Sequence, residues 1–90
     1  MAFELLGKIA KEWKPVLAEF QPELLFFSAG FDAHRLDPLG ELNWESEDYR
    51  KITEAVVDAA GCTKVISVLE GGYSLEALDT AVLQHLSGIT

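Results

Sequence analysis

The sequence predicts an α/β fold in which helices and parallel strands alternate in the order α-β-α-β-α. Two short stretches dominated by apolar residues, 23–29 and 64–69, predict buried strands, and the second is rich in β-branched residues. Three stretches with apolar residues three and four positions apart, 3–20, 46–60 and 75–86, predict helices. Because a helix lies between the two strands, they form a βαβ unit, and we expect them to pair in parallel through a right-handed crossover.

The first predicted helix, residues 3–20, contains a break. Its apolar side chains form one face of an amphipathic helix, but Pro15 lies inside this pattern. Proline lacks a backbone donor and clashes with the carbonyl group four residues earlier. We therefore expect a kink or a restarted helix at Pro15, and an end of the helix at Gln21-Pro22.

The loop that follows the first strand, 30–43, is longer than most strand-to-helix connections, which have about 2–6 residues. Long ordered loops at strand ends are often functional. Asn43 and Ser46 are both suitable caps for the helix that follows, and Gly61 is its expected C-terminal stop. Ser74 is expected to cap the last helix.

Two parallel strands with three helices make a poor independent sheet. A chain of 90 residues also buries only roughly 60–65% of its unfolded surface, so its own core would be thin. We therefore expect residues 1–90 to form a single small α/β domain that corresponds to a piece of a larger doubly wound fold.

The charge balance excludes some classes of partner. Seven Lys and Arg against fifteen Asp and Glu give a formal net charge of −8. No basic patch is available to neutralise phosphates, so we expect no nucleic acid and no anionic membrane surface as a partner. No apolar stretch approaches the ~20 residues of a membrane span. The single cysteine, Cys62, excludes an intrachain disulfide and favours a reducing compartment, so we expect a cytoplasmic protein.

Asp32 is the first candidate for chemistry, because ligands of open parallel sheets bind just beyond the carboxyl ends of the strands. A carboxylate there can bind a metal, act as a base, or cap its own turn. His34 forms a metal pair with Asp32 only if the segment stays extended; otherwise its ring is a hydrogen-bond partner. Asp37 begins Asp-Pro-Leu-Gly, which is typical of a turn, so a structural role is favoured for this candidate.

The second candidate lies at the end of the second strand, where Gly71, Gly72 and Tyr73 precede the last helix. Two glycines allow the backbone to turn sharply or to approach a ligand. The Tyr73 hydroxyl could donate a hydrogen bond to a developing oxyanion, or the ring could be an aromatic plug against the first loop. A third alternative is an anion bound by the helix amides after Ser74.

Two long motifs identify a resemblance. Residues 25–40, Leu-Phe-Phe-Ser-Ala-Gly-Phe-Asp-Ala-His-Arg-Leu-Asp-Pro-Leu-Gly, resemble a hallmark block of the zinc-dependent histone deacetylase superfamily. Residues 68–75, Val-Leu-Glu-Gly-Gly-Tyr-Ser-Leu, resemble its second block. This superfamily includes bacterial acetoin-utilisation proteins and acetylpolyamine amidohydrolases. The resemblance covers nearly the whole chain and implies the C-terminal third of an arginase/deacetylase-like fold with three layers, a parallel sheet between helices.

The resemblance implies hydrolysis of acetamides, such as those of acetylated lysine or polyamines, at a zinc ion. Asp32 corresponds to one carboxylate ligand of this zinc, and Tyr73 to the residue that hydrogen-bonds the substrate carbonyl and stabilises the tetrahedral oxyanion. Gly71 and Gly72 correspond to the pocket floor, and Leu39 to the channel for the acyl-lysine side chain. Zinc in such enzymes polarises the carbonyl group and acidifies its bound water.

The sequence also departs from this family. The other zinc ligands, an Asp and a His of an Asp-x-His motif, and the His-His pair of general bases have no counterpart among these residues. We therefore expect the isolated chain to be inactive unless a complementary chain completes the site. The alternative is a non-catalytic module, derived from a truncated deacetylase gene, that self-associates through surfaces normally covered by the rest of the domain. An anion-binding module is the third hypothesis.

Overall fold

The computed structural model describes residues 2–40 and 42–90 and confirms the α/β fold. Its elements follow one another as α1 (Ala2–Lys8), η1 (Ile9–Trp13), α2 (Lys14–Phe20), β1 (Leu25–Ala29), α3 (Ser46–Ala60), β2 (Val65–Leu69) and α4 (Leu75–Ile89). The two strands pair in parallel, with Leu25 opposite Val65 and Ala29 opposite Leu69. In the described residues, no helix is long and apolar enough to cross a membrane.

The expected break in the first helix is a π-helical turn. Residues 2–20 wind continuously as α1, η1 and α2, and Pro15 lies in the first turn of α2. Since Pro15 has no N–H, the carbonyl group four residues earlier loses its usual partner, and the helix widens over Ile9–Trp13. The segment ends where Gln21 adopts a left-handed conformation (φ 55°).

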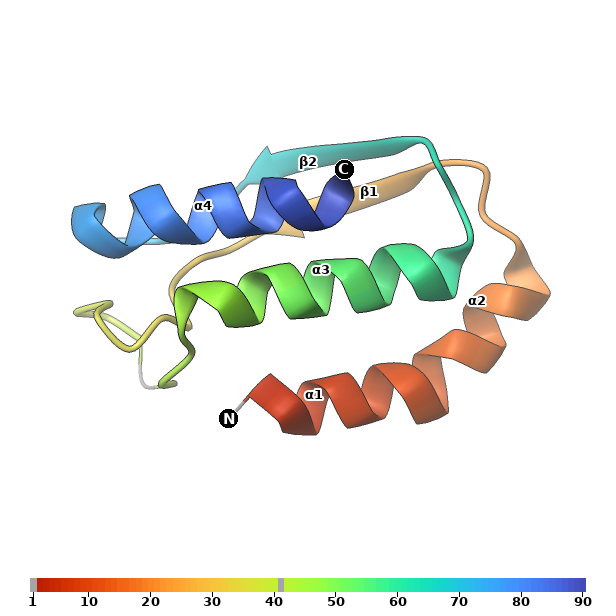
Figure 1. Cartoon of the computed structure of the whole chain (residues 1–90), viewed down its shortest axis with the longest axis horizontal. Helices are drawn as coiled ribbons and strands as arrows, with labels where there is room; N and C mark the ends of the chain where they lie inside the picture. The colour runs from red at the N-terminus through yellow and green to blue at the C-terminus, as the bar shows by residue number, and fades with distance from the viewer. Residues whose placement is uncertain (1, 41) are drawn as a thin grey trace.

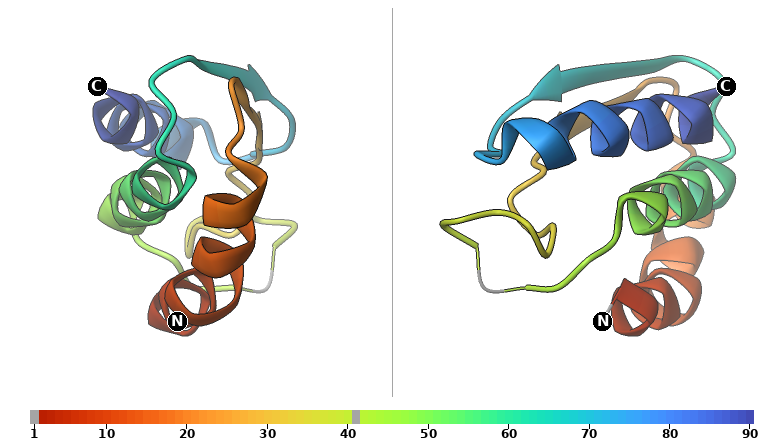
Figure 2. Two further views of the ribbon diagram at one scale, coloured as in Figure 1. Left: turned by 90° about the vertical axis from the view of Figure 1, so that its right-hand side faces the viewer. Right: turned by 60° about the vertical axis from the view of Figure 1, so that its left-hand side comes forward.

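The helices cover one face of the two-stranded sheet (Figures 1 and 2). Leu25 and Phe27 point from β1 into a core built around Ile9, Val56 and Ala59. A second cluster forms nearer the strand ends, around Phe31, Tyr49 and Ala81. Helices α3 and α4 lie side by side and contribute to this cluster, which therefore supports the loop that leaves β1.

The opposite face of the sheet is exposed and apolar. Phe26 of β1 is 57% exposed, and Ile66 and Val68 of β2 are 46% and 44% exposed. These side chains alternate with the inward-pointing ones, as in a sheet that is buried on both faces. The described residues therefore supply two of the three expected layers, and a third would lie over this face.

The residues that end and cap α3 and α4 are those predicted from the sequence, except for the N-terminal cap of α3. Gly61 ends α3 in a left-handed conformation (φ 62°), and the Ser74 hydroxyl caps α4 by accepting the N–H of Ala77 at 3.2 Å. The cap of α3 is Glu45, whose N–H donates to the Asp48 carboxylate at 2.8 Å. The prediction of Asn43 or Ser46 as the cap was wrong, because the Ser46 hydroxyl takes part in another hydrogen-bond network.

Candidate functional site

The parallel pairing brings the two predicted strand ends to one edge of the sheet. The ladder continues past the strands, because the N–H of Glu70 donates to the Ala29 carbonyl at 2.8 Å and that of Phe31 to the Gly71 carbonyl at 2.7 Å. The segment that carries Asp32 therefore runs directly beside the Gly-Gly-Tyr turn (Figure 1). This is the edge of a parallel sheet at which ligands bind.

Asp32 and Tyr73 converge at Gly71. A Cβ atom placed on Gly71 would lie 3.1 Å from Oδ2 of Asp32 and 3.5 Å from the Tyr73 hydroxyl oxygen. The two functional groups therefore border one small space, which the missing side chain of Gly71 leaves open. Tyr73 is 54% exposed, so its hydroxyl can reach a bound molecule.

The backbone conformation at position 72 requires glycine. Its φ of 137° lies in the region that favours glycine, and an added Cβ would lie 3.0 Å from Cβ of Phe31 and from Cδ1 of Leu78. The turn therefore approaches the first loop closely, and Tyr73 is presented at the strand end because of this approach.

Asp37 is the buried anchor of the first loop. Its Oδ1 accepts the N–H groups of Leu39 and Gly40 at 2.8 and 2.9 Å, and its Oδ2 accepts that of Tyr73 at 2.7 Å. Burial alone raises the pKa of the Asp37 carboxyl. The hydrogen bonds from these three backbone N–H groups and from that of Ser74 lower it by more, so the pKa lies below its ordinary value. Leu39, in the same turn, is 71% exposed.

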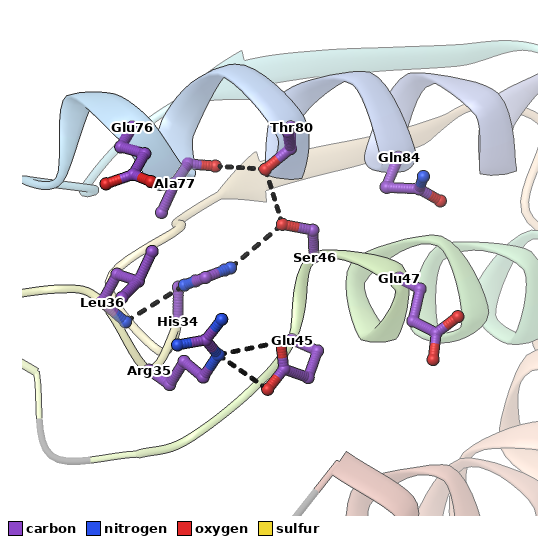
Figure 3. Close-up of a pocket in the computed structure, with 10 residues that line it drawn as sticks. All are labelled: His34, Arg35, Leu36, Glu45, Ser46, Glu47, Glu76, Ala77, Thr80 and Gln84. Atoms are coloured by element: carbon purple, nitrogen blue, oxygen red, sulfur yellow. Dashed lines mark hydrogen bonds and ion pairs between the residues drawn. The ribbon is translucent and has the colours of Figure 1, made fainter.

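His34 has a hydrogen-bonding role, and both of its ring nitrogens are engaged (Figure 3). Its Nδ1 accepts the N–H of Leu36 at 3.1 Å, so Nε2 carries the proton and donates to the Ser46 hydroxyl at 3.0 Å. Ser46 in turn pairs with the Thr80 hydroxyl at 2.7 Å, and Thr80 donates to the Ala77 carbonyl at 3.2 Å. His34 thus ties the first loop to α3 and α4, and leaves no nitrogen for a metal beside Asp32.

The surface around His34 forms an open groove of about 650 Å³ between this loop and the two helices. Its wall includes the exposed ion pair between Arg35 and Glu45 at 2.8 Å, together with Glu47 and Glu76. Asp32 and Tyr73 do not line it. The groove is therefore separate from the strand-end site, and its exposed charges give no indication of chemistry.

Comparison with known proteins fits this geometry. The family model of the histone deacetylase domain matches residues 3–89. The chain belongs to the histone deacetylase family. It is 40% identical over 77 residues to type-2 histone deacetylase 1 of Dictyostelium discoideum, an alignment that covers 82% of this chain and 5% of the relative. It is 37% identical over 81 residues to the histone deacetylase-like amidohydrolase of Pseudomonas aeruginosa, covering 83% of this chain and 21% of the relative.

The solved structure of the HDA15 HD domain has the same fold, with a TM-score of 0.86 and 28% identity over 98% of this chain. That alignment covers 25% of the HDA15 chain. This histone deacetylase segment therefore spans about a quarter, or less, of the length of the relatives that it matches.

The described residues do not by themselves fit a zinc ion. Within residues 2–40 and 42–90, no three His, Cys, Asp or Glu side chains are grouped so that they could hold a metal. A catalytic zinc needs three protein ligands. Asp32 is one suitable carboxylate, whereas His34 is committed to hydrogen bonds on both sides.

Sequence reasoning missed the buried network around His85, which is 5% exposed on α4. Thr53 donates to the Tyr49 carbonyl at 2.6 Å, so its oxygen accepts Nδ1–H of His85 at 2.7 Å. The Ser67 hydroxyl then donates to Nε2 at 2.7 Å. Burial lowers the pKa of His85, which is held neutral. The available indication was the spacing of His85, which lies four positions after Ala81 and three after Val82 on the apolar face of the helix.

Tyr49 is a buried residue of α3. Burial raises the pKa of this phenol to about 12. Among the described residues its oxygen has no hydrogen-bond partner. The ring packs against Phe31 and Trp44, so Tyr49 supports the base of the loop that carries Asp32.

Proposed function

We propose that this chain carries one part of the catalytic centre of a zinc-dependent deacetylase, which hydrolyses acetamides of the acetyl-lysine type. The observation that supports the proposal is the convergence of the Asp32 carboxylate and the Tyr73 hydroxyl at Gly71, at the carboxyl edge of two parallel strands. Membership of the histone deacetylase family supports this reaction class, and the juxtaposition of Asp32 and Tyr73 supports this location for the site.

In this proposal, the two groups have different roles. The Asp32 carboxylate is one ligand of the zinc ion. The Tyr73 hydroxyl is a neutral donor that hydrogen-bonds the substrate carbonyl oxygen and strengthens this bond as negative charge develops there. Gly71 and Gly72 form the floor beneath the reacting group, and the exposed Leu39 contacts the acyl-lysine chain as it enters.

The remaining zinc ligands and the general bases come from polypeptide outside these 90 residues, either elsewhere in a longer chain or in a complementary one. The large exposed apolar face of the sheet, with Phe26, Ile66 and Val68, supports this part of the proposal, because it offers a surface for the third layer. The 90 residues alone are then inactive. Polyamine deacetylase HDAC10 of Homo sapiens is 43% identical over 68 residues, so an acetylated polyamine is a second substrate to test.

The same exposed face favours a second candidate, a non-catalytic module that associates with itself. For both candidate functions, the proposed localisation of the protein is the cytoplasm, where the buried free thiol of Cys62 stays reduced. The two candidates differ in whether the strand-end site binds zinc once the missing layer is supplied.

The proposal is tested in a chimera, in which residues 3–89 replace the matching quarter of the HDA15 HD domain. We expect one zinc per chain and hydrolysis of an acetyl-lysine peptide. Asp32→Asn should abolish tight zinc binding in calorimetry, whereas Asp79→Asn, an exposed carboxylate on α4, should not. Tyr73→Phe should keep the zinc and lower kcat by roughly 10²–10³-fold.

A folded chimera in which Asp32→Asn retains zinc and full activity would overturn the proposal. Zinc titration of the 90-residue chain itself is the complementary measurement. We expect weak binding that is indifferent to Asp32→Asn; tight binding near one zinc per chain, lost in the mutant, would show instead that self-association completes a site.

A further inference from the structure

We propose that Asp37 is a positioning residue for the reaction, which holds the Tyr73 hydroxyl at its place beside Asp32. The inference rests on the proposed function and adds to it a residue that touches neither the zinc nor the substrate. Sequence reasoning favoured a turn-forming role for Asp37. The structure joins that turn to both members of the candidate pair.

The link to Tyr73 is direct. Oδ2 of Asp37 accepts the backbone N–H of Tyr73 at 2.7 Å, although the two residues are 36 positions apart. This hydrogen bond fixes the backbone from which the exposed Tyr73 side chain projects. No other side chain among the described residues bonds that N–H group. Movement of this backbone is therefore transmitted to the hydroxyl.

The link to Asp32 passes through Gly40. Oδ1 of Asp37 accepts the N–H groups of Leu39 and Gly40 and so closes the turn. A Cβ atom at Gly40 would overlap the backbone carbonyl oxygen of Asp32, so the closed turn rests directly on the backbone of Asp32. One carboxylate therefore sets the position of Tyr73 relative to Asp32.

The chemistry of the carboxylate suits this task. Asp37 is 7% exposed, and no ion pair in residues 2–40 and 42–90 includes it, so backbone N–H groups satisfy its charge. A charged acceptor forms stronger hydrogen bonds than a neutral one. In Asp37→Asn, an NH₂ group would replace one of the two acceptor oxygens. This donor would then face another donor, either the N–H of Tyr73 or those of Leu39 and Gly40.

The first test is amide hydrogen exchange by NMR on the 90-residue chain. In Asp37→Asn, exchange of the Tyr73 amide should become at least about tenfold faster, while amides in the middle of α3 keep their protection. Asp79→Asn makes the same chemical change on an exposed surface of α4 and should leave the Tyr73 amide unchanged. Unchanged exchange in Asp37→Asn would contradict the direct link.

The second test is a double-mutant cycle in the chimera with an acetyl-lysine peptide. Asp37→Asn should lower kcat roughly 10- to 100-fold and change KM by less than about threefold. In a Tyr73→Phe background the same substitution should have almost no further effect, because the hydroxyl that Asp37 positions is already absent. Equal effects in both backgrounds would overturn the inference, since they would indicate a merely structural role.

Asp37→Glu keeps the charge and both acceptor oxygens, and should recover part of the lost kcat. It also replaces Asp37→Asn as the test variant if the latter fails to fold. An active chimera that is indifferent to Asp37→Asn would refute this inference and leave the proposed function intact. A chimera without zinc or activity would refute the proposed function, while the exchange measurement would still decide whether Asp37 fixes Tyr73.

Discussion

At the scale of single residues, the two histidines show how hydrogen bonds decide what a side chain can do. Both are buried, and each has both ring nitrogens engaged, His34 by Leu36 and Ser46, and His85 by Thr53 and Ser67. Each bonding pattern fixes one neutral tautomer. Neither ring is free to act as a metal ligand or as a base, so their contribution is to hold elements together.

Protonation of His85 should destabilise the fold. Its pKa is lowered by burial, so the unfolded chain binds this proton more tightly than the folded chain does. The contribution of neutral His85 to the stability of the fold is therefore fully present above the ordinary pKa of 6.5. This contribution falls as the pH drops below that value. The ring faces Phe27, Phe31, Thr53 and Ser67, none of which carries a compensating charge.

Chemical denaturation between pH 8 and pH 5 tests this prediction. We expect the free energy of unfolding to decline below about pH 6.5. His85→Gln should lower stability at all pH values and flatten this slope. If the pH dependence of the free energy of unfolding were unchanged in His85→Gln, groups other than His85 would be responsible for it.

At the scale of elements, the sequence was sufficient to predict helices over 3–20, 46–60 and 75–86 and the two strands of the described residues, because their patterns are local; the π-helical turn η1 was not predicted. The predictions used short apolar runs, the three-to-four spacing of apolar residues, and the local effects of Pro15, Gly61 and Ser74. All of these act between residues that are close in sequence. The contacts that build the site are not local. The bond from Tyr73 to Asp37 spans 36 residues, and no periodicity indicates it. The βαβ topology predicts Asp32 and Tyr73 at one edge of the sheet, but their convergence at Gly71 depends on three-dimensional contacts that no local pattern indicates.

The close packing of α3 against α4 gives a prediction from two glycines. A Cβ atom at Gly88 of α4 would lie 2.8 Å from Cβ of Thr53 and 2.9 Å from the Arg50 carbonyl oxygen, whereas Gly7 of α1 has open space. Gly88→Ala should therefore destabilise the chain by about 1–3 kcal/mol through overpacking. Gly7→Ala should stabilise it by about 0.5–1 kcal/mol through helix propensity.

Thermal unfolding of the two variants beside the unmodified chain measures this difference. Because the substitution is the same and both sites are helical, intrinsic propensity favours alanine in each case. A rise in the melting temperature of Gly88→Ala would mean that α4 moves away from α3 at little cost, contrary to the tight contact in the structure.

At the scale of the whole molecule, the sheet has an apolar face that the described helices do not cover. Phe26, Ile66 and Val68 form an exposed apolar face on the sheet, and each of the two strands has one edge without a β partner among the described residues. Edges and faces of this kind associate with further strands and layers. The chain also matches about a quarter of the HDA15 chain.

We therefore expect the isolated 90-residue chain to self-associate through the exposed face of its sheet. Val68→Lys places a charge on this face and should shift the chain towards monomer in sedimentation velocity experiments, with little change in far-UV circular dichroism. Val16→Lys makes the same substitution at an exposed position of α2 and should leave association in place. A monomeric parent chain at high concentration would contradict the prediction. Loss of association in both variants would instead indicate nonspecific contacts, because only one of the two lies on the sheet.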